Sequence, residues 1–147
     1  MHIWVDADAC PKTIRKILFR AAERLKIPVS FISNQRLTIP KSDFIQTIQV
    51  PGGFDIADEY IIKNADRFDI VITADIPLAV SVIDKGALAL NPRGTLYDQD
   101  NINEILTVRN LKIELKSAGL DIGGPSQFKP EDIQAFANQL DRLLSNL

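Results

Sequence analysis

Short apolar runs that alternate with helix-like segments constrain the fold of this chain most strongly. Residues 70–73, I-V-I-T, form a continuous apolar run, which is typical of a parallel strand buried on both faces. Residues 3–5, 29–33 and 87–91 form similar runs, and residues 45–50 alternate apolar and polar side chains, as an edge strand does. Helical spacing or helix-boundary residues mark the intervening segments, which are 11–27, the stretch from 55 onward, 76–85, 101–118 and 130–147.

Strands that alternate with helices predict an α/β fold. We expect a three-layer, doubly wound and mostly parallel sheet with extra helices at the C-terminal end. The length of 147 residues suits a single domain over residues 1–147. Because crossovers between parallel strands are right-handed, the loops that follow the strands should meet at one rim of the sheet.

Composition narrows the classes of function and location. The net charge of −2 argues against unspecific coating of nucleic acid but leaves room for a local basic groove. Cys10 is the only cysteine, so an intrachain disulfide is excluded and a reducing compartment is favoured. The chain shows neither a signal-peptide pattern nor an apolar run long enough to span a membrane. These features predict a soluble, cytoplasmic protein.

Acidic residues occur at three points that this fold would bring to the same rim. They are Asp6 and Asp8 after the first strand, Asp55, Asp58 and Glu59 at a helix start, and Asp75 after the buried strand. Ligands of open α/β sheets bind at the carboxyl ends of the strands. Carboxylates that gather there repel one another unless a cation joins them or a pKa rises. Mg²⁺ or Mn²⁺ is the expected cation, because hard divalent ions prefer oxygen ligands.

Helix capping is the competing explanation for several of these acids. Asp8 can cap the helix that begins near Pro11, and Asp75 can cap the helix that follows it. Asp55 is well explained as a cap. Asp58, three residues later, is less well explained in this way, so it is the preferred ligand of its segment. Glu59 is expected to be solvated.

Other polar residues follow strands and can reach the same rim. Asn34 comes after the second strand, Thr73 ends the buried strand, and Arg93 follows residues 87–91. Thr73 can bind a phosphate or hold a carboxylate in place, and Arg93 can grip a phosphate or form an ordinary ion pair. A helix N-terminus near Cys10 can lower its pKa, but no histidine partner supports a nucleophile there.

Several motifs together resemble the YaiI/YqxD family of bacterial proteins. They are V-D-A-D-A-C-P, S-N-Q, F-D-I-A-D, V-I-T-A-D-I-P-L-A, L-N-P-R-G and G-G-P, and they run through the whole chain. The acidic layout of that family resembles the PIN-like nuclease superfamily. This resemblance implies a PIN-like domain with a metal-dependent phosphodiesterase site and RNA as the substrate. It also allows a homodimer, because many PIN-like proteins form pairs.

The resemblance also implies roles for individual residues. Asp6, Asp58 and Asp75 match the catalytic, metal-binding acids of PIN-like nucleases. The fourth acid of that pattern has no clear counterpart: Asp8 is the first candidate and Asp55 the second. Whether one or two Mg²⁺ or Mn²⁺ ions bind is therefore open. Asn34, Thr73 and Arg93 would position the substrate phosphate.

Two other functions compete with a nuclease. D-A-D resembles the D-x-D motif of haloacid-dehalogenase-like phosphatases, in which the first aspartate is a nucleophile. That family places a hydroxyl residue two positions after the motif, where this chain has Cys10. A PIN-like module that binds RNA or a protein without catalysis is the other alternative.

Overall fold

A six-stranded sheet forms the centre of the molecule. The computed structural model describes residues 1–53, 55–124 and 126–145. The strands lie in the order β3-β2-β1-β4-β5-β6, and every neighbouring pair is parallel except the antiparallel pair of β5 and β6. Their bounds are β1 Ile3–Asp6, β2 Val29–Ser33, β3 Ile45–Gln49, β4 Ile70–Ile72, β5 Leu88–Leu90 and β6 Leu96–Tyr97. This confirms the α/β class and the mostly parallel sheet.

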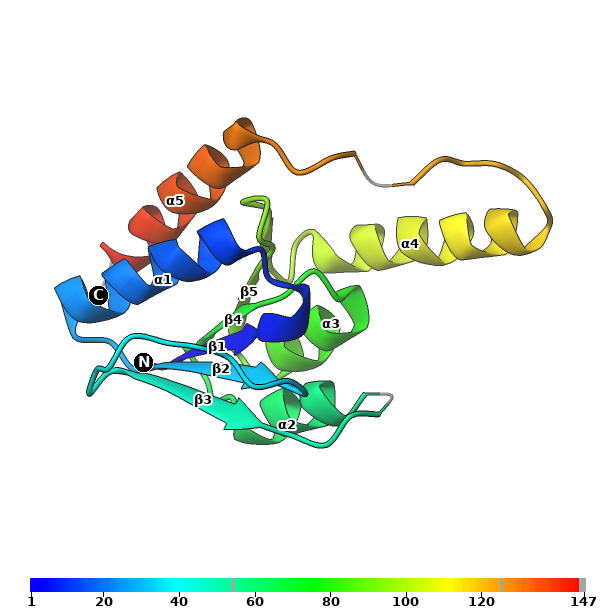
Figure 1. The fold of residues 1–147 in the computed structure, drawn as a ribbon. Helices are drawn as coiled ribbons and strands as arrows, with labels where there is room; N and C mark the ends of the chain where they lie inside the picture. Colours follow the sequence, from blue (N-terminus) through cyan, green and yellow to red (C-terminus); the bar gives the residue numbers. More distant parts are fainter. Residues whose placement is uncertain (54, 125, 146–147) are drawn as a thin grey trace.

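Helices cover both faces of the sheet, giving three layers (Figure 1). A short 3-10 turn, η1 (Ala7–Ala9), follows β1. The helices are α1 Lys12–Leu25, α2 Ile56–Asn64, α3 Ile76–Asp84, α4 Ile102–Ser117 and α5 Pro130–Leu144. In Figure 1, α1 and α5 lie on one side of the sheet and α2 and α3 on the other, while α4 extends away from it.

Alternation along the strands divides the core into two clusters. Val5 and Ile72 belong to the cluster under α1 and α5, whereas Trp4 and Val71 belong to the cluster under α2 and α3. Neighbouring residues therefore point to opposite faces, as the two-residue period of a strand requires. Both faces are apolar because helices cover both. Trp4 and Phe136 are buried core residues, as expected.

The sheet differs from expectation at its far edge. Residues 87–91 are not the last strand, because β6 follows and pairs with β5 in an antiparallel hairpin. The turn between them is closed by a hydrogen bond from the Asn91 amide to the carbonyl of Thr95, at 2.8 Å. A strand of two residues is too short to produce a recognisable alternation, so the sequence pattern missed it. At the opposite edge, β3 is the edge strand that the alternation of residues 45–50 predicts.

Helix boundaries agree with the sequence to within a few residues. α1 stops at Leu25, and Lys26 adopts a left-handed conformation with φ 55°, so the helix ends before Pro28 is reached. α5 begins at Pro130 as predicted, but its predicted end at residue 147 lies outside the described residues. Phe54 and Pro125, which belong to predicted motifs, also lie outside them. Within the described ranges, every helix is too short or too polar to cross a membrane.

Candidate functional site at the carboxyl ends of the strands

Thr73 joins two of the predicted acids at the ends of β1 and β4. Its hydroxyl donates a hydrogen bond to Asp6 Oδ2 at 3.1 Å and accepts one from the backbone amide of Asp75 at 2.9 Å. The Thr73 side chain is buried, so this link is fixed and shielded from water. Of the two roles predicted for Thr73, the structure shows that of holding a carboxylate.

Asp75 also caps α3, as the competing explanation predicted. Its Oδ1 accepts a hydrogen bond from the Leu78 amide at 3.0 Å. A carboxylate has several acceptor positions, so one capping bond leaves acceptor capacity for a further ligand. Capping and ligand binding are therefore compatible at Asp75, and the cap fixes the position of the side chain.

The Asp6 carboxyl is partly buried beside other acids. Burial raises the pKa of Asp6, the hydrogen bond from Thr73 opposes that shift, and the charges of Asp75 and Asp8 raise the pKa further. Asp75 and Asp8 therefore both lie close enough to Asp6 for their charges to oppose its ionisation. Such a cost is relieved when a positive charge enters the site.

Asp58 reaches the same group of acids from the first turn of α2. Its pKa is raised to about 7, most by burial and then by the charges of Asp75 and Asp6, a hydrogen bond with the Asp75 carboxyl and the charge of Asp55. This position is consistent with the prediction that Asp58, and not Asp55 or Glu59, is the ligand of its segment. Asp6, Asp58 and Asp75 thus converge although they come from β1, α2 and the end of β4.

Asp8 is held by the end of β2 and not by a helix. Its carboxylate accepts a hydrogen bond from Ser33 Oγ at 2.6 Å and another from the Asn34 amide at 2.9 Å. The explanation of Asp8 as the cap of α1 is therefore wrong, since Pro11 occupies that N-cap position without a side-chain cap. Asn34 contributes its backbone at this point. The sequence did not predict Ser33 as a site residue, although Ser33 begins the S-N-Q motif.

Asp55 and Glu59 play smaller parts. Asp55 stands at the N-cap position of α2, but its side chain makes no capping hydrogen bond. The backbone there is left-handed, with φ 62°, a conformation that short polar side chains such as aspartate tolerate. The expectation that Asp55 caps α2 through its side chain is therefore wrong. Glu59 is exposed to solvent, as predicted.

Arg93 forms an ion pair at the turn after β5. Its Nη1 lies 3.2 Å from Asp132 Oδ2 and 3.2 Å from Ser126 Oγ, and its Nη2 donates to the Ser126 carbonyl. The guanidinium also lies over the ring of Phe128, 5.6 Å from its centroid. Arg93 thus fastens the segment before α5 to the sheet, and phosphate binding by this side chain stays a prediction.

Cys10 is a buried thiol without nucleophilic character. Burial raises its pKa to about 12, the charge of Arg15 lowers it only in part, and the charge of Asp6 raises it. The expectation that a helix N-terminus lowers this pKa is therefore wrong, because loss of solvation outweighs it. A thiol that stays protonated near neutral pH is a poor nucleophile.

The donor set at this rim suits a divalent cation by its chemistry. Over residues 1–53, 55–124 and 126–145, no three His, Cys, Asp or Glu side chains are arranged as metal ligands. The carboxylates of Asp6, Asp58 and Asp75 nevertheless interact by charge, and the pKa values of Asp6 and Asp58 are both raised. Carboxylates that oppose one another's ionisation are stabilised as anions when a hard cation such as Mg²⁺ or Mn²⁺ binds to them. The chemistry of these residues suits the cation that the sequence predicts, and its binding here stays a prediction.

Metal-free stability should depend on pH through Asp58. Its pKa is raised from 3.8 to about 7, so the folded chain keeps a proton that the unfolded chain has released. The stability present below pH 3.8 is therefore lost progressively as the pH rises towards 7. We expect Asp58→Asn to remove part of this dependence and to raise the melting temperature in EDTA more at pH 8 than at pH 5.

Thermal melts of the wild type, Asp58→Asn and Glu59→Gln between pH 5 and pH 8 check this expectation. Glu59 is a matched control, because it is the next residue of α2 and loses the same charge on substitution. Equal stability gains at pH 5 and pH 8 for Asp58→Asn would show that its carboxyl has an ordinary pKa.

The comparisons with known proteins agree with the motifs. A model described as "Uncharacterized BCR, YaiI/YqxD family" matches residues 4–146. The chain belongs to the YaiI/YqxD family. A UPF0178 protein of Bordetella avium is 57% identical over 99% of this chain and 94% of its own length. UPF0178 proteins of a Janthinobacterium species and of Proteus mirabilis are 54% and 52% identical, over 99% and 98% of this chain and 96% and 95% of their own lengths. No solved structure matches the chain.

Proposed function

We propose that this YaiI/YqxD-family protein is a Mg²⁺- or Mn²⁺-dependent nuclease of PIN-like type that cleaves RNA. Asp6, Asp58 and Asp75 would hold the cation, with Asp8 beside them. The observation that carries the proposal is the convergence of these carboxyls at the carboxyl ends of β1 and β4, where ionisation of Asp6 and Asp58 is opposed by their neighbours.

The side chains around the site keep the acids in place. Thr73 fixes Asp6 relative to Asp75, and the capping bond to Leu78 fixes Asp75 on α3. Ser33 and the Asn34 amide fix Asp8. A bound divalent cation supplies an activated water and stabilises the leaving oxygen of a phosphodiester. Preorganised ligands of this kind do not need to rearrange when the cation and the substrate arrive.

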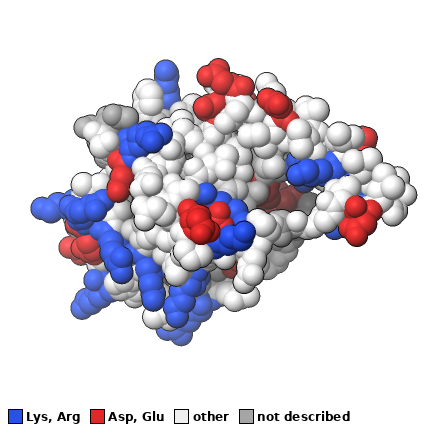
Figure 2. Space-filling model, turned by 90° about the horizontal axis from the view of Figure 1, so that it is seen from above, with Lys and Arg blue, Asp and Glu red and all other residues white. Residues whose placement is uncertain are grey.

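Basic side chains offer a surface for the RNA backbone. Lys12, Lys16, Arg20 and Arg24 are exposed on α1, which begins just after η1 and Asp8. Figure 2 shows Lys and Arg gathering on the side of the molecule where α1 and α5 lie. Positive charge attracts phosphates whatever their sequence, so this face favours a polyanionic substrate. Asn34, whose side chain is exposed near Asp8, would add a polar contact to the phosphate.

A pair of neighbouring variants tests the proposal. Wild-type protein is expected to cleave single-stranded RNA in Mn²⁺ and to stop when EDTA is added. Asp58→Asn should lower the cleavage rate by ~10-fold or more, whereas Glu59→Gln should leave it within about 2-fold, because only Asp58 faces the other acids. Gel assays on labelled RNA, with a DNA strand of the same sequence beside it, measure both effects. RNA binding that needs no metal, without cleavage of either strand, would overturn the nuclease proposal.

A further inference from the structure

Helix α4 exposes apolar side chains along its middle and second half. Val108, Leu111 and Ile113 are 44%, 52% and 48% exposed. The start of the helix is anchored, because Ile102 is buried and Ile105 packs against the core under α3. Beyond that point α4 extends away from the sheet (Figure 1). Val108 and Leu111 are three residues apart and so share one face of the helix, and neighbouring apolar side chains on a projecting helix mark an interaction surface.

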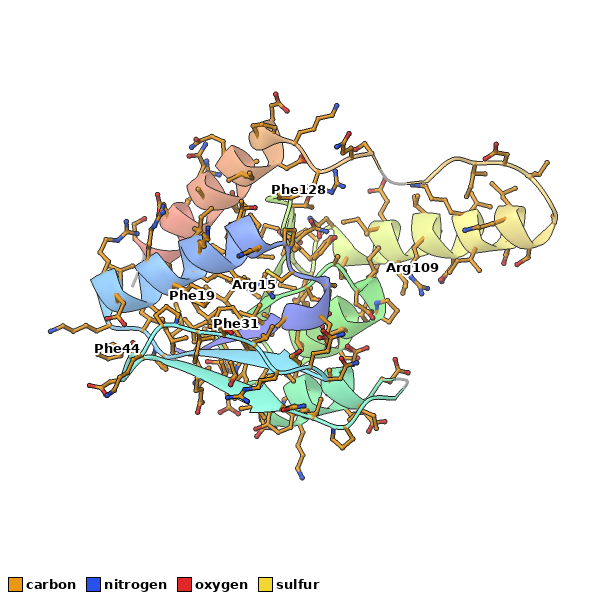
Figure 3. All side chains as sticks on the ribbon, in the orientation of Figure 1. Arg15, Phe19, Phe31, Phe44, Arg109 and Phe128 are labelled. Carbon is orange, nitrogen blue, oxygen red and sulfur yellow. The ribbon has the colours of Figure 1, made fainter. Side chains whose placement is uncertain are left out.

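A hollow of about 470 Å³ lies beside these side chains, where α4 meets the start of α3. Ile76 of α3 and Ile105 and Val108 of α4 line it, and so do the charged residues Glu104 and Lys112. Figure 3 shows Arg109, which also lines the hollow, on the side of α4 away from the segment that returns to α5. This face is therefore open to a partner and has room for inserted side chains.

The spacing on α4 is that of a helix-pairing seam. Ile105, Val108, Lys112 and Leu115 follow one another at intervals of three, four and three residues. That alternation places the residues along one stripe of the helix, as in the seam between two packed helices. Lys112 is the polar member of the stripe. An α-helix is thus the shape of partner that suits this surface.

Two charges flank the centre of the seam and are complementary to each other. Glu104 lies four residues before Val108 and Lys112 four residues after it, so all three share a face. Within the described ranges the ion pairs are Arg24–Asp141 and Arg93–Asp132. The described part of the chain therefore supplies no salt-bridge partner for Glu104 or Lys112.

We propose that this face of α4 pairs with α4 of a second copy of the chain, antiparallel, around a two-fold axis at Val108. In that arrangement Glu104 of each copy lies level with Lys112 of the other, so the two opposite-charge contacts occur together. Leu111 lies level with Ile105, and Val108 meets Val108. A parallel pair would instead bring like charges level, which disfavours it. A two-fold interface uses one self-complementary patch twice, and this patch has that property.

The pairing makes a distinctive prediction for charge reversal. Glu104→Lys gives each copy two lysines at the flanking positions, and Lys112→Glu gives each copy two glutamates. Either variant alone should therefore raise the dimer dissociation constant by ~10-fold or more, because like charges face each other twice. An equimolar mixture of the two variants should form a heterodimer at least as tight as the wild-type dimer.

Sedimentation velocity over a range of protein concentrations measures these constants. The mixture keeps the test decisive, since recovery of pairing shows that both variants are folded. Glu23→Lys on α1 is the control, because it reverses an exposed charge far from the seam and should leave the constant unchanged. A wild-type protein that stays monomeric at millimolar concentration would overturn the proposal. So would a dimer that neither reversal weakens, since it would use another surface.

Discussion

Asp6→Asn is expected to lower Mn²⁺-dependent RNA cleavage by ~100-fold or more while leaving the domain folded. Asp6 is the last residue of β1, and the charges of both Asp75 and Asp8 act on its carboxyl. Asparagine keeps an oxygen that can accept the hydrogen bond from Thr73, so the local structure should persist. It removes the negative charge that a cation needs, so the loss should appear in catalysis.

The stability of the metal-free Asp6→Asn protein should not fall along with its activity. Removing a carboxylate whose ionisation is opposed by burial and by two acids should raise the metal-free melting temperature at pH 8 or leave it unchanged. Single-turnover cleavage assays and thermal melts in EDTA measure the two effects. Asp43→Asn, at an exposed acid before β3, serves as the control and should change neither. Unfolding of the Asp6 variant would identify Asp6 as a structural residue, and full activity would remove it from the site.

Gly94→Ala is expected to destabilise the fold by about 3 kcal/mol, from left-handed backbone strain and overpacking together. Gly94 has φ 94°, and a Cβ there would stand 2.6 Å from the carbonyl carbon of Ala135 and 2.8 Å from its carbonyl oxygen. The atoms in the way belong to the backbone of α5, so they cannot turn aside as a flexible side chain does. The turn between β5 and β6 would have to separate from α5.

Gly119→Ala separates the two causes of that loss. Gly119 has a similar φ of 85°, but a Cβ there would have no neighbour within 4 Å. It should therefore show only the conformational part, about 1–2 kcal/mol. Urea unfolding of both variants measures the difference. Equal losses at the two positions would show that the contact between the β5–β6 turn and α5 relaxes at little cost.

The sequence predicts those elements whose signals are local and long enough to recur. The continuous run 70–73 identifies β4 as a buried central strand, and the alternation of residues 45–50 identifies β3 as an edge. Asp75 caps α3 because an acid followed by Ile76 and Pro77 forms a local capping signal. β6 escapes detection because two residues carry no period, although the N-P-R-G turn before it was visible.

Long-range pairings are the part that local patterns do not reveal. Arg93 forms an ion pair with Asp132, 39 positions away, and the sequence around neither residue predicts the other as its partner. Asp8 looks like a helix cap by its position, yet Ser33 and Asn34 bind it because β2 lies beside β1. The acids at the strand ends were predictable as a group, since the parallel topology alone brings the ends of β1 and β4 together.

Helix α4 shows how composition can mislead about burial. Its apolar residues occur at nearly every angle around the helix, a pattern typical of a helix buried on all sides. The structure instead leaves Val108, Leu111 and Ile113 exposed. The proposed pairing with a second copy would cover Val108 and Leu111, because their missing neighbour would then be another α4.

Calorimetric titration of Mn²⁺ into the wild type and Asp6→Asn tests the central claim, that Asp6, Asp58 and Asp75 form one cation site, most directly. The wild type is expected to bind Mn²⁺ saturably at pH 8 and more weakly at pH 5, because the raised pKa of Asp58, about 7, makes protons compete with the ion. Asp6→Asn, folded by thermal melt, should lose the binding. Wild-type protein that takes up no Mn²⁺ at pH 8, or a folded Asp6 variant that binds it equally well, would contradict the account.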